Sequence, residues 1–304
     1  MAEVQFTYAD PAFPLPKRAL IRAIEKVTGQ PRLKQLYLEN QRNPVAGESF
    51  FGASVRQLRL DVRYDEGQLA KIPATGPCII VANHPYGVLD GVTIGWIIEK
   101  IRRDFVILTN AVLLHAPETK GYLLPVDFAE TDEAMKTNLE TRAAARKHLD
   151  AGGCVIVFPA GGVSTSPDKL GRKPAIDAPW QPFTAQLIQR SKAAVVPIFF
   201  GGQNSRLFQI ASHLHLTLRL SLIFKEVHDR IGTTLDVVIG DPIDREQLLS
   251  SSDRKAIVTE LMHRTYALGA QITPTRLSRL EKLKLRRKAL ALKFVRRHRQ
   301  AVGR

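Results

Sequence analysis

A histidine and an aspartate stand close together just after a short apolar segment. Residues 78–82 are rich in β-branched side chains and lead directly into Asn83, His84 and Pro85. This pattern predicts a fully buried strand, and open α/β sheets place their ligand crevices at the carboxyl ends of such strands. Asp90 follows His84 with five residues between them, where an apolar periodic segment predicts a helix start. An imidazole oriented by a carboxylate can take a proton from a hydroxyl group.

The residue types alone leave a structural alternative open, because a single histidine after a strand is most often a loop residue without a chemical role. The chain contains no Gly-x-Ser-x-Gly nucleophile elbow, no P-loop and no Gly-x-Gly-x-x-Gly fingerprint. His213 and His215 have a spacing that zinc ligands use, but no third ligand accompanies them, so a helix surface is the simpler interpretation. The sequence therefore predicts neither a metal nor a cofactor.

A second candidate segment follows another apolar stretch, at residues 155–165. A buried strand that ends in proline and two glycines places bare backbone N–H groups beside the crevice, where they can bind an anion or a developing oxyanion. Glycine-rich turns are mostly only turns, so this segment gains meaning from its place after the first. The candidate substrate-binding residues of the two segments are Asn83, Gly87, Phe158, Pro159, Gly161, Gly162, Ser164 and Thr165.

Taken in order, these segments resemble the motifs of the glycerolipid acyltransferase superfamily, which includes the 1-acylglycerol-3-phosphate acyltransferases. The closest resemblance is to its hemolysin-like, or lyso-ornithine-lipid acyltransferase, branch. Asn-His-Pro-x-Gly-x-x-Asp-Gly at 83–91 resembles the first motif, with one residue more than usual between His84 and Asp90. Phe-Pro-Ala-Gly at 158–161 resembles the third motif, and Val-Val-Pro-Ile at 195–198 the last. The resemblance spans about residues 20–243.

The resemblance implies an enzyme that transfers a fatty acyl group from acyl carrier protein or coenzyme A to the hydroxyl of a lysolipid. It implies that His84 is the general base and that Asp90 orients its ring. Backbone amides near Gly161 and Gly162 are the expected oxyanion donors, and no acyl-enzyme is expected because no activated Ser or Cys is present. Two alternatives stay open: a thioesterase-like hydrolase, and a non-catalytic basic protein that binds membranes or nucleic acid.

Departures from the family motifs concern the acceptor. Ala160 and Val163 replace a glutamate and an arginine of the third motif, and no arginine follows Gly121, where the second motif has one. A guanidinium fork is the natural reader of a phosphate. The branch resemblance and these losses favour a lyso-aminolipid such as lyso-ornithine lipid over 1-acylglycerol-3-phosphate. Point charges remain in the next loop, which is equally well interpreted as a solvated basic loop: Lys169, Arg172 and Lys173.

Length and composition predict an α/β protein with a mostly parallel central sheet and crossover helices. The chain has 304 residues, 44% of them hydrophobic, and its apolar strand-like segments alternate with helical ones. We expect an N-terminal helical element at 1–52, an α/β acyltransferase domain at 53–272 and a basic tail at 273–304. The two cysteines, Cys78 and Cys154, lie in apolar segments and predict buried side chains in a reducing compartment. Neither a secretory signal nor a membrane span is evident.

The tail contains most of the net charge of +15. From Arg276 to Arg304 it has twelve Lys and Arg residues and one acidic residue, with leucines spaced along one helical face. A basic amphipathic helix is typical of segments that bind an anionic membrane surface. We therefore expect a cytoplasmic protein, peripheral on the inner face of the cell membrane, and no nucleic-acid partner. A nucleic-acid arm and a solvated helix remain the alternatives for this segment.

Overall fold

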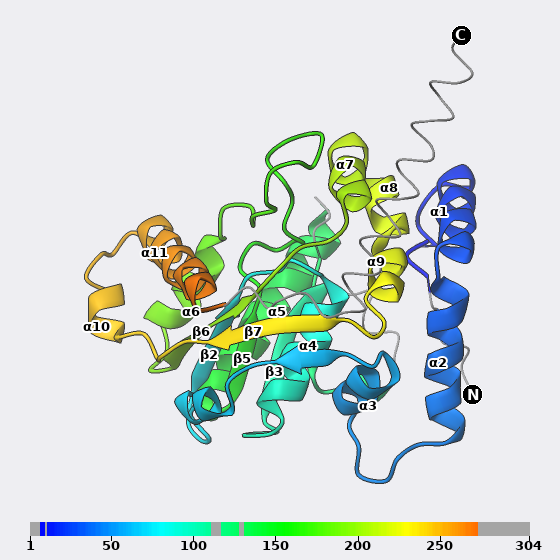
Figure 1. The fold of residues 1–304 in the computed structure, drawn as a ribbon. Helices are drawn as coiled ribbons and strands as arrows, with labels where there is room; N and C mark the ends of the chain where they lie inside the picture. Colours follow the sequence, from blue (N-terminus) through cyan, green and yellow to red (C-terminus); the bar gives the residue numbers. More distant parts are fainter. Residues whose placement is uncertain (1–6, 10, 111–116, 128–130, 273–304) are drawn as a thin grey trace. The chain divides into compact units, whose positions relative to one another are not determined.

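The computed structural model describes residues 7–9, 11–110, 117–127 and 131–272 (Figure 1). The chain divides into two compact units, Met1–Gly269 and Ala270–Arg304. The basic helix that the sequence predicts after Pro274 lies outside the described residues.

In the described part of the chain, seven strands form one sheet in the order β1-β7-β6-β2-β5-β3-β4. Neighbouring strands run parallel except for β6 and β7, which are antiparallel. The predicted α/β fold with a mostly parallel sheet is therefore confirmed. The strands are β1 (Asp61–Arg63), β2 (Cys78–Ala82), β3 (Phe105–Asn110), β4 (Leu123–Val126), β5 (Cys154–Val157), β6 (Ala194–Phe200) and β7 (Thr234–Ile239).

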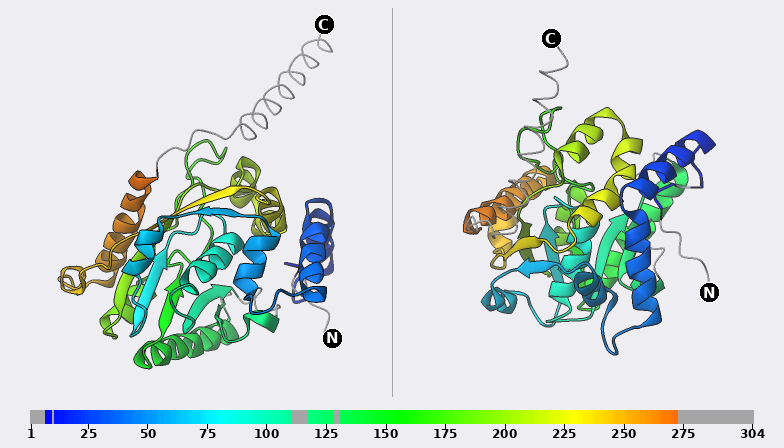
Figure 2. Two further views of the ribbon diagram at one scale, coloured as in Figure 1. Left: turned by 60° about the horizontal axis from the view of Figure 1, so that its bottom comes forward. Right: turned by 45° about the vertical axis from the view of Figure 1, so that its right-hand side comes forward.

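Helices cover both faces of the sheet (Figure 2). Apolar side chains of α3 and α4 pack on one face, and those of α5, α6 and α11 pack on the other. The helices are α1 (Leu15–Val27), α2 (Gln30–Arg42), α3 (Phe50–Gln57), α4 (Val88–Ile98), α5 (Asp132–Asp150), α6 (Pro182–Gln189), α7 (Arg206–Leu214), α8 (Leu216–Ser221), α9 (Ile223–Asp229), α10 (Arg245–Leu248) and α11 (Arg254–Ala267).

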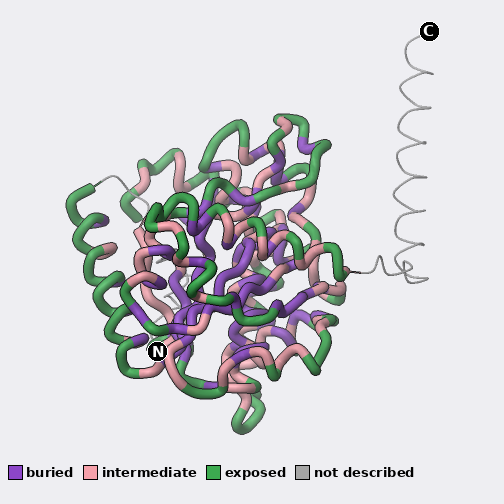
Figure 3. The backbone as a smooth tube through the Cα atoms, turned by 90° about the vertical axis from the view of Figure 1, so that its left-hand side faces the viewer, coloured by how far each residue is buried: buried purple, intermediate pink, exposed green. Residues whose placement is uncertain are grey.

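Every residue of β2 and β5 is buried, and the strands form the buried interior of the backbone trace in Figure 3. Strands covered on both faces need apolar side chains at successive positions, because neither face meets water. This explains why the sequence shows continuous apolar segments here instead of alternation. Burial on both faces also holds the carboxyl ends of β2 and β5 in the rigid core.

The sequence predicts a strand over residues 55–64, and this prediction is wrong for its first part. Helix α3 extends into that segment, because the Ser49 hydroxyl caps its N-terminus and the buried side chains of Phe51 and Val55 lie one turn apart. The remaining short strand, β1, lies at the edge of the sheet, as predicted.

Other differences concern segments with weak local patterns. The segment before Pro125 is expected to be irregular, but β4 pairs there with β3 at the second edge of the sheet. The helix expected from Arg206 to about His228 is divided into α7, α8 and α9, with extended backbone at His215. This division matters below, since it places α8 beside the candidate site.

A buried arginine ties together the loops at the amino ends of the central strands. Arg102 is 4% exposed. Its guanidinium donates hydrogen bonds to the carboxylate of Asp104 and to the carbonyl oxygens of Pro73, Gly76 and Gly152. Carbonyls at the chain's turns would be left without partners if this side chain were removed.

We therefore expect Arg102→Ala to lower the free energy of unfolding by about 3 kcal/mol. In a domain of this size the melting temperature should fall by roughly 6–12 °C. Differential scanning calorimetry checks this, with Arg103→Ala as the matched control, because Arg103 is the adjacent arginine and is exposed. Equal melting temperatures for the two variants would contradict the assignment.

Candidate functional site

The two predicted segments meet because their strands are neighbours. β2 and β5 run parallel, with Val81 opposite Val157, so the residues that follow each strand meet at one edge of the sheet. There the ring of His84 stacks on the ring of Phe158, with 4.2 Å between centroids and 30° between planes. Phe158 thus forms one wall for the imidazole.

His84 and Asp90 are brought together as the sequence predicts. Nδ1 of His84 lies 3.0 Å from Oδ2 of Asp90. The atoms are within hydrogen-bonding distance, although Nδ1 makes no well-aligned hydrogen bond, and such contacts commonly tighten when substrate binds. The imidazole is 18% exposed while the carboxyl is fully buried. Because Nδ1 faces the carboxylate, Nε2 is the nitrogen that remains for a ligand.

The carboxyl of Asp90 is held by the turn that precedes it. Its Oδ2 accepts hydrogen bonds of 2.8 Å from the backbone N–H groups of Tyr86 and Gly87. Burial raises the pKa of Asp90, while the His84 ring and the two amides lower that pKa in part. The Asp90 carboxylate lies against Nδ1 of His84 and can hold the ring in one orientation, with Nε2 directed away from it.

A glycine allows the turn between the two side chains. Gly87 has φ of +76°, a left-handed conformation that favours glycine. A Cβ atom there would lie 3.0 Å from Cγ2 of Val163, so the turn also packs closely on the loop after β5. This turn accommodates the five residues between His84 and Asp90, and Asp90 sits in the first turn of α4.

Asn83, proposed from the sequence to bind substrate, has structural partners. Its side chain is buried and makes two hydrogen bonds with the backbone of Phe200, as donor to the carbonyl at 2.9 Å and as acceptor from the N–H at 2.7 Å. Both polar groups of the amide are therefore used. Asn83 thereby fastens the end of β2 to β6.

The loop after β5 contributes backbone groups beside the histidine. The N–H of Gly161 donates to the carbonyl of Phe158, which closes the turn. Among the described residues, the N–H of Gly162 has no hydrogen-bond acceptor. The N–H of Ser164 donates to the carbonyl of His84 at 2.8 Å. Of the two glycines expected to serve an oxyanion, Gly162 is therefore the one with its donor available.

Asp177 also contacts the site, although no sequence motif indicates it. Its Oδ1 accepts from the N–H of His84 at 3.2 Å and from the Ser164 hydroxyl, and its Oδ2 accepts from Nε1 of Trp180 at 2.9 Å. Asp177 is 93 positions from His84 along the chain. Asp177 lies in a loop without a recognisable sequence pattern, so the sequence could not indicate its contact with His84.

The basic residues proposed for the acceptor lie farther out. Thr165 and Ile176 form an isolated antiparallel bridge that closes the intervening loop. The proposed point charges of this loop, Lys169, Arg172 and Lys173, are exposed to solvent. The structure does not bring these side chains into contact with His84.

The site has no metal-binding arrangement among the described residues, where no group of three or more His, Cys, Asp or Glu side chains is placed to hold an ion. His213 instead contacts the carbonyl of Ser166, and His215 accepts from the N–H of Thr217 at the start of α8. A surface hollow of about 480 Å³ lies elsewhere, lined by Arg56, Trp96 and other residues of α3 and the end of α4. None of the residues that line this hollow belongs to the candidate site, so the hollow is not part of it.

Comparison with known proteins gives consistent results. The family model described as Acyltransferase matches residues 39–273. The lyso-glycine lipid O-acyltransferase of Phocaeicola vulgatus is 27% identical over 238 residues, which are 74% of this chain and 79% of that protein. The protein of the same name from Bacteroides thetaiotaomicron is 27% identical over 192 residues, 60% of this chain and 67% of that protein.

Among solved structures, that of the 1-acyl-sn-glycerophosphate (LPA) acyltransferase PlsC from Thermotoga maritima is similar, with a TM-score of 0.49 and 14% identity. The alignment covers 86% of this chain and 83% of that one.

The raised pKa of Asp90 predicts a pH-dependent difference in stability. A carboxyl whose pKa is raised on folding stabilises the folded protein most when protonated, and this contribution is lost as the pH rises through the raised value. Asparagine cannot ionise. We therefore expect the stability of Asp90→Asn relative to wild type to increase as the pH rises above about 4, the ordinary range of a carboxyl group.

Urea unfolding at a series of pH values measures this difference. Asp168→Asn is the control, because the backbone N–H of Arg172 is the main cause of a lowered pKa at Asp168. Its stability relative to wild type should decrease as the pH rises toward about 4 and stay constant above that, because the change lies below the ordinary carboxyl pKa. The same slope for both variants would show that the Asp90 environment is described wrongly.

Proposed function

This chain belongs to the acyltransferase family, and we propose that it transfers a fatty acyl group from an acyl thioester to the hydroxyl of a lysolipid. The observation that supports the proposal most is the pair of His84 and Asp90, 3.0 Å apart at the carboxyl end of β2. The ring is partly exposed and the carboxyl is buried. This is the arrangement that general-base catalysis requires.

In the proposed reaction, Nε2 of His84 takes the proton of the acceptor hydroxyl as its oxygen attacks the thioester carbonyl. Asp90 stabilises the imidazolium that forms. The tetrahedral intermediate then collapses, the carbon–sulfur bond breaks, and His84 returns the proton to the departing thiolate. An ester and a free thiol are the products, and the imidazole is neutral again.

The oxyanion of the intermediate needs a donor close to His84. The free N–H of Gly162 is our candidate, because the neighbouring residue Ser164 is hydrogen-bonded to the backbone of His84. One such donor contributes roughly 3–4 kcal/mol of transition-state stabilisation in hydrolases.

Direct attack without an acyl-enzyme is the step we propose. Cys78 and Cys154 are buried, and each is the first residue of its strand. Both thiols therefore lie at the amino ends of the strands, whereas His84 follows the carboxyl end of β2. Neither thiol can therefore reach a thioester held at the site. The hydroxyl of Ser164 is engaged by Asp177.

For the acceptor, we propose a lysolipid built on an amino acid. The relatives from P. vulgatus and B. thetaiotaomicron are named for a lyso-glycine lipid, and the third-motif loop of this chain has Val163 where a phosphate-binding arginine would stand. An amino acid acylated at its nitrogen by a hydroxy fatty acid offers a hydroxyl on the acyl chain and a carboxylate in the headgroup. Acyl carrier protein or coenzyme A is the proposed carrier of the donor.

We also propose that the enzyme works peripherally on the inner face of the cell membrane. The support is the basic composition of the segment after Pro274, which suits an anionic lipid surface. No helix in the described ranges has the length and apolar character needed to cross a bilayer.

The function is tested by incubating the enzyme with acyl carrier protein and coenzyme A thioesters and a panel of lysolipids, with products identified by mass spectrometry. Wild type should form a diacylated product, most efficiently with amino-acid lysolipids. His84→Ala should reduce turnover at least about 100-fold, because the base is lost while the core is unchanged. Asp90→Asn should reduce it nearly as much.

Two outcomes would contradict this assignment. Release of free fatty acid at a rate independent of acceptor would identify a thioesterase-like hydrolase. Near wild-type turnover by a folded His84→Ala protein would exclude the proposed base.

Removal of residues 274–304 tests the membrane proposal. We expect the truncated protein to bind anionic vesicles more weakly than the full chain, with little change for zwitterionic vesicles. Moderate salt should have the same effect on the full chain, because it screens exposed charges beyond about 10 Å. Vesicle sedimentation measures both, and equal binding of the two proteins at low salt would rule out the tail as the anchor.

A further inference from the structure

Arg219 reaches the candidate site from a helix remote in sequence. It lies on α8, and its guanidinium contacts the loop after β5. Nη1 donates a 2.9 Å hydrogen bond to the Thr165 hydroxyl, and Nη2 donates to the carbonyl of Val163. The guanidinium also lies 5.5 Å from the centre of the Phe208 ring. These contacts hold the fork of the arginine in one orientation.

The charge of Arg219 has no counter-ion in the described ranges, where no acidic side chain lies within ion-pair distance of it. Burial is the cause that lowers its pKa. The described hydrogen bonds use two of the five N–H donors of a guanidinium. A half-buried cation with three donors left is poorly satisfied by the protein itself, and an anion would satisfy it.

Arg245 shows what a structural arginine without a carboxylate looks like in this fold. It is also half-buried, and its Nη2 donates to the carbonyl oxygens of Ile188 and Ser191, while its Nε is buried without a partner among the described residues. Those carbonyls belong to the C-terminal end of α6 and the residues just after it, where cations are favoured. Arg219 has no such explanation, because its acceptors lie in a loop.

The loop that Arg219 contacts is the loop that contacts His84. Ser164, between the two residues that accept hydrogen bonds from Arg219, donates its N–H to the carbonyl of His84. On the preceding side, a Cβ atom added to Gly162 would lie 3.9 Å from Nη2 of Arg219. The free N–H of Gly162 and the free donors of Arg219 therefore border the same part of the site.

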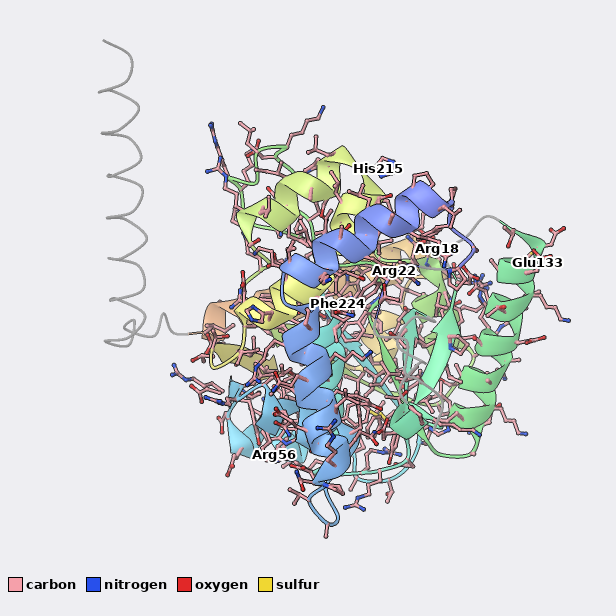
Figure 4. The ribbon with its side chains drawn as sticks, turned by 90° about the vertical axis from the view of Figure 1, so that its right-hand side faces the viewer. Arg18, Arg22, Arg56, Glu133, His215 and Phe224 are labelled. Carbon is pink, nitrogen blue, oxygen red and sulfur yellow. The ribbon has the colours of Figure 1, made fainter. Side chains whose placement is uncertain are left out.

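Helix α1 closes this region from another direction. α1 packs against α8, and its buried residue Ile21 belongs to a cluster that includes Val88, next to Gly87. Figure 4 shows Arg18 and Arg22 on the side of α1 nearer to Phe224. The surface around α8 also exposes Leu207, Leu214 and Leu216. An anionic headgroup with an apolar chain therefore meets suitable neighbours here.

We propose that Arg219 binds the carboxylate of the acceptor's headgroup and so holds the acceptor hydroxyl within reach of His84. This inference rests on the proposed function. A single guanidinium with paired donors matches a carboxylate, which has one charge and two oxygens. The guanidinium contacts the backbone of Val163 itself, so α8 supplies to this loop a group that the loop's own sequence lacks.

The test compares two acceptors and two side chains. The acceptors are an N-(hydroxyacyl)glycine and its primary amide, which has the same size without the charge. Wild type should prefer the carboxylate. In Arg219→Gln, KM for the carboxylate should rise about tenfold or more, kcat should change less, and KM for the amide should stay constant. Arg219→Lys should recover part of the preference, because it keeps the charge and loses the fork.

Arg245→Gln is the matched control and should leave both KM values unchanged. Equal losses for both acceptors in Arg219→Gln would overturn the proposal, because the arginine would then only support the loop. Unchanged kinetics would also overturn it. A wild-type enzyme that prefers lysophosphatidic acid, with this preference lost in Arg219→Gln, would show that the anion is a phosphate instead.

Direct binding separates this inference from the proposed function. If wild type transfers no acyl group to any acceptor, the proposed function fails. Calorimetric titration of the full chain with the N-(hydroxyacyl)glycine and its amide still tests Arg219. Tighter binding of the carboxylate by wild type but not by Arg219→Gln supports the inference, and equal binding of the two ligands overturns it. Should Arg219→Gln not fold, the same comparison with Arg219→Lys decides.

Discussion

The buried carboxylate of Asp90 is the constraint on which the rest of the site depends. A carboxyl removed from water needs partners, and all those of Asp90 lie at Oδ2: the N–H groups of Tyr86 and Gly87 and, at 3.0 Å, the His84 ring. Among the described residues, Oδ1 has no hydrogen-bond partner. Meeting this requirement shapes the turn after β2 and fixes the first turn of α4. Because α4 is packed into the core through its isoleucines, the position of the imidazole is tied to the most rigid part of the protein.

A second carboxylate fastens the opposite side of the same histidine. Asp177 accepts from the backbone of His84, the hydroxyl of Ser164 and the indole of Trp180, and its own N–H donates to the Tyr266 hydroxyl. The side chain of Asp177 thereby joins the turn after β2 to the loop after β5, and its backbone N–H adds helix α11. The orientation of His84 is thus set by one carboxylate on its ring and another on its backbone.

The proposed division between chemistry and recognition follows from this construction. The proton-transfer pair comes from one short segment and is held by the core, whereas Arg219 comes from a helix on the surface. Changes in α8 can then alter which headgroup is accepted without moving His84 or Asp90. Such a separation lets the headgroup site change while the core of the sheet remains the same.

The sequence by itself determined the sheet, the central strands and the pair of His84 and Asp90. These features have local patterns: continuous apolar segments predict buried strands, and a histidine and a carboxylate six positions apart can meet across one turn. The strand expected over residues 55–64 was only partly right, because the apolar spacing that fits a strand there overlaps the spacing that α3 uses. The roles of the site residues remain predictions, although their places are now known.

Only the tertiary structure decided the remainder. Asn83 looked like a ligand-binding residue until β6 was seen beside it, because a sequence does not show which backbone lies across the sheet. Asp177 has no local signal for its contact with His84, which is 93 positions away. The sequence places Arg219 only in an apolar segment beside the site, and its hydrogen-bond partners are about 55 positions away. Contacts of this kind depend on which strands are neighbours and on how the short helices α7, α8 and α9 pack against the loop after β5. Those are consequences of packing the whole chain, not of any single segment.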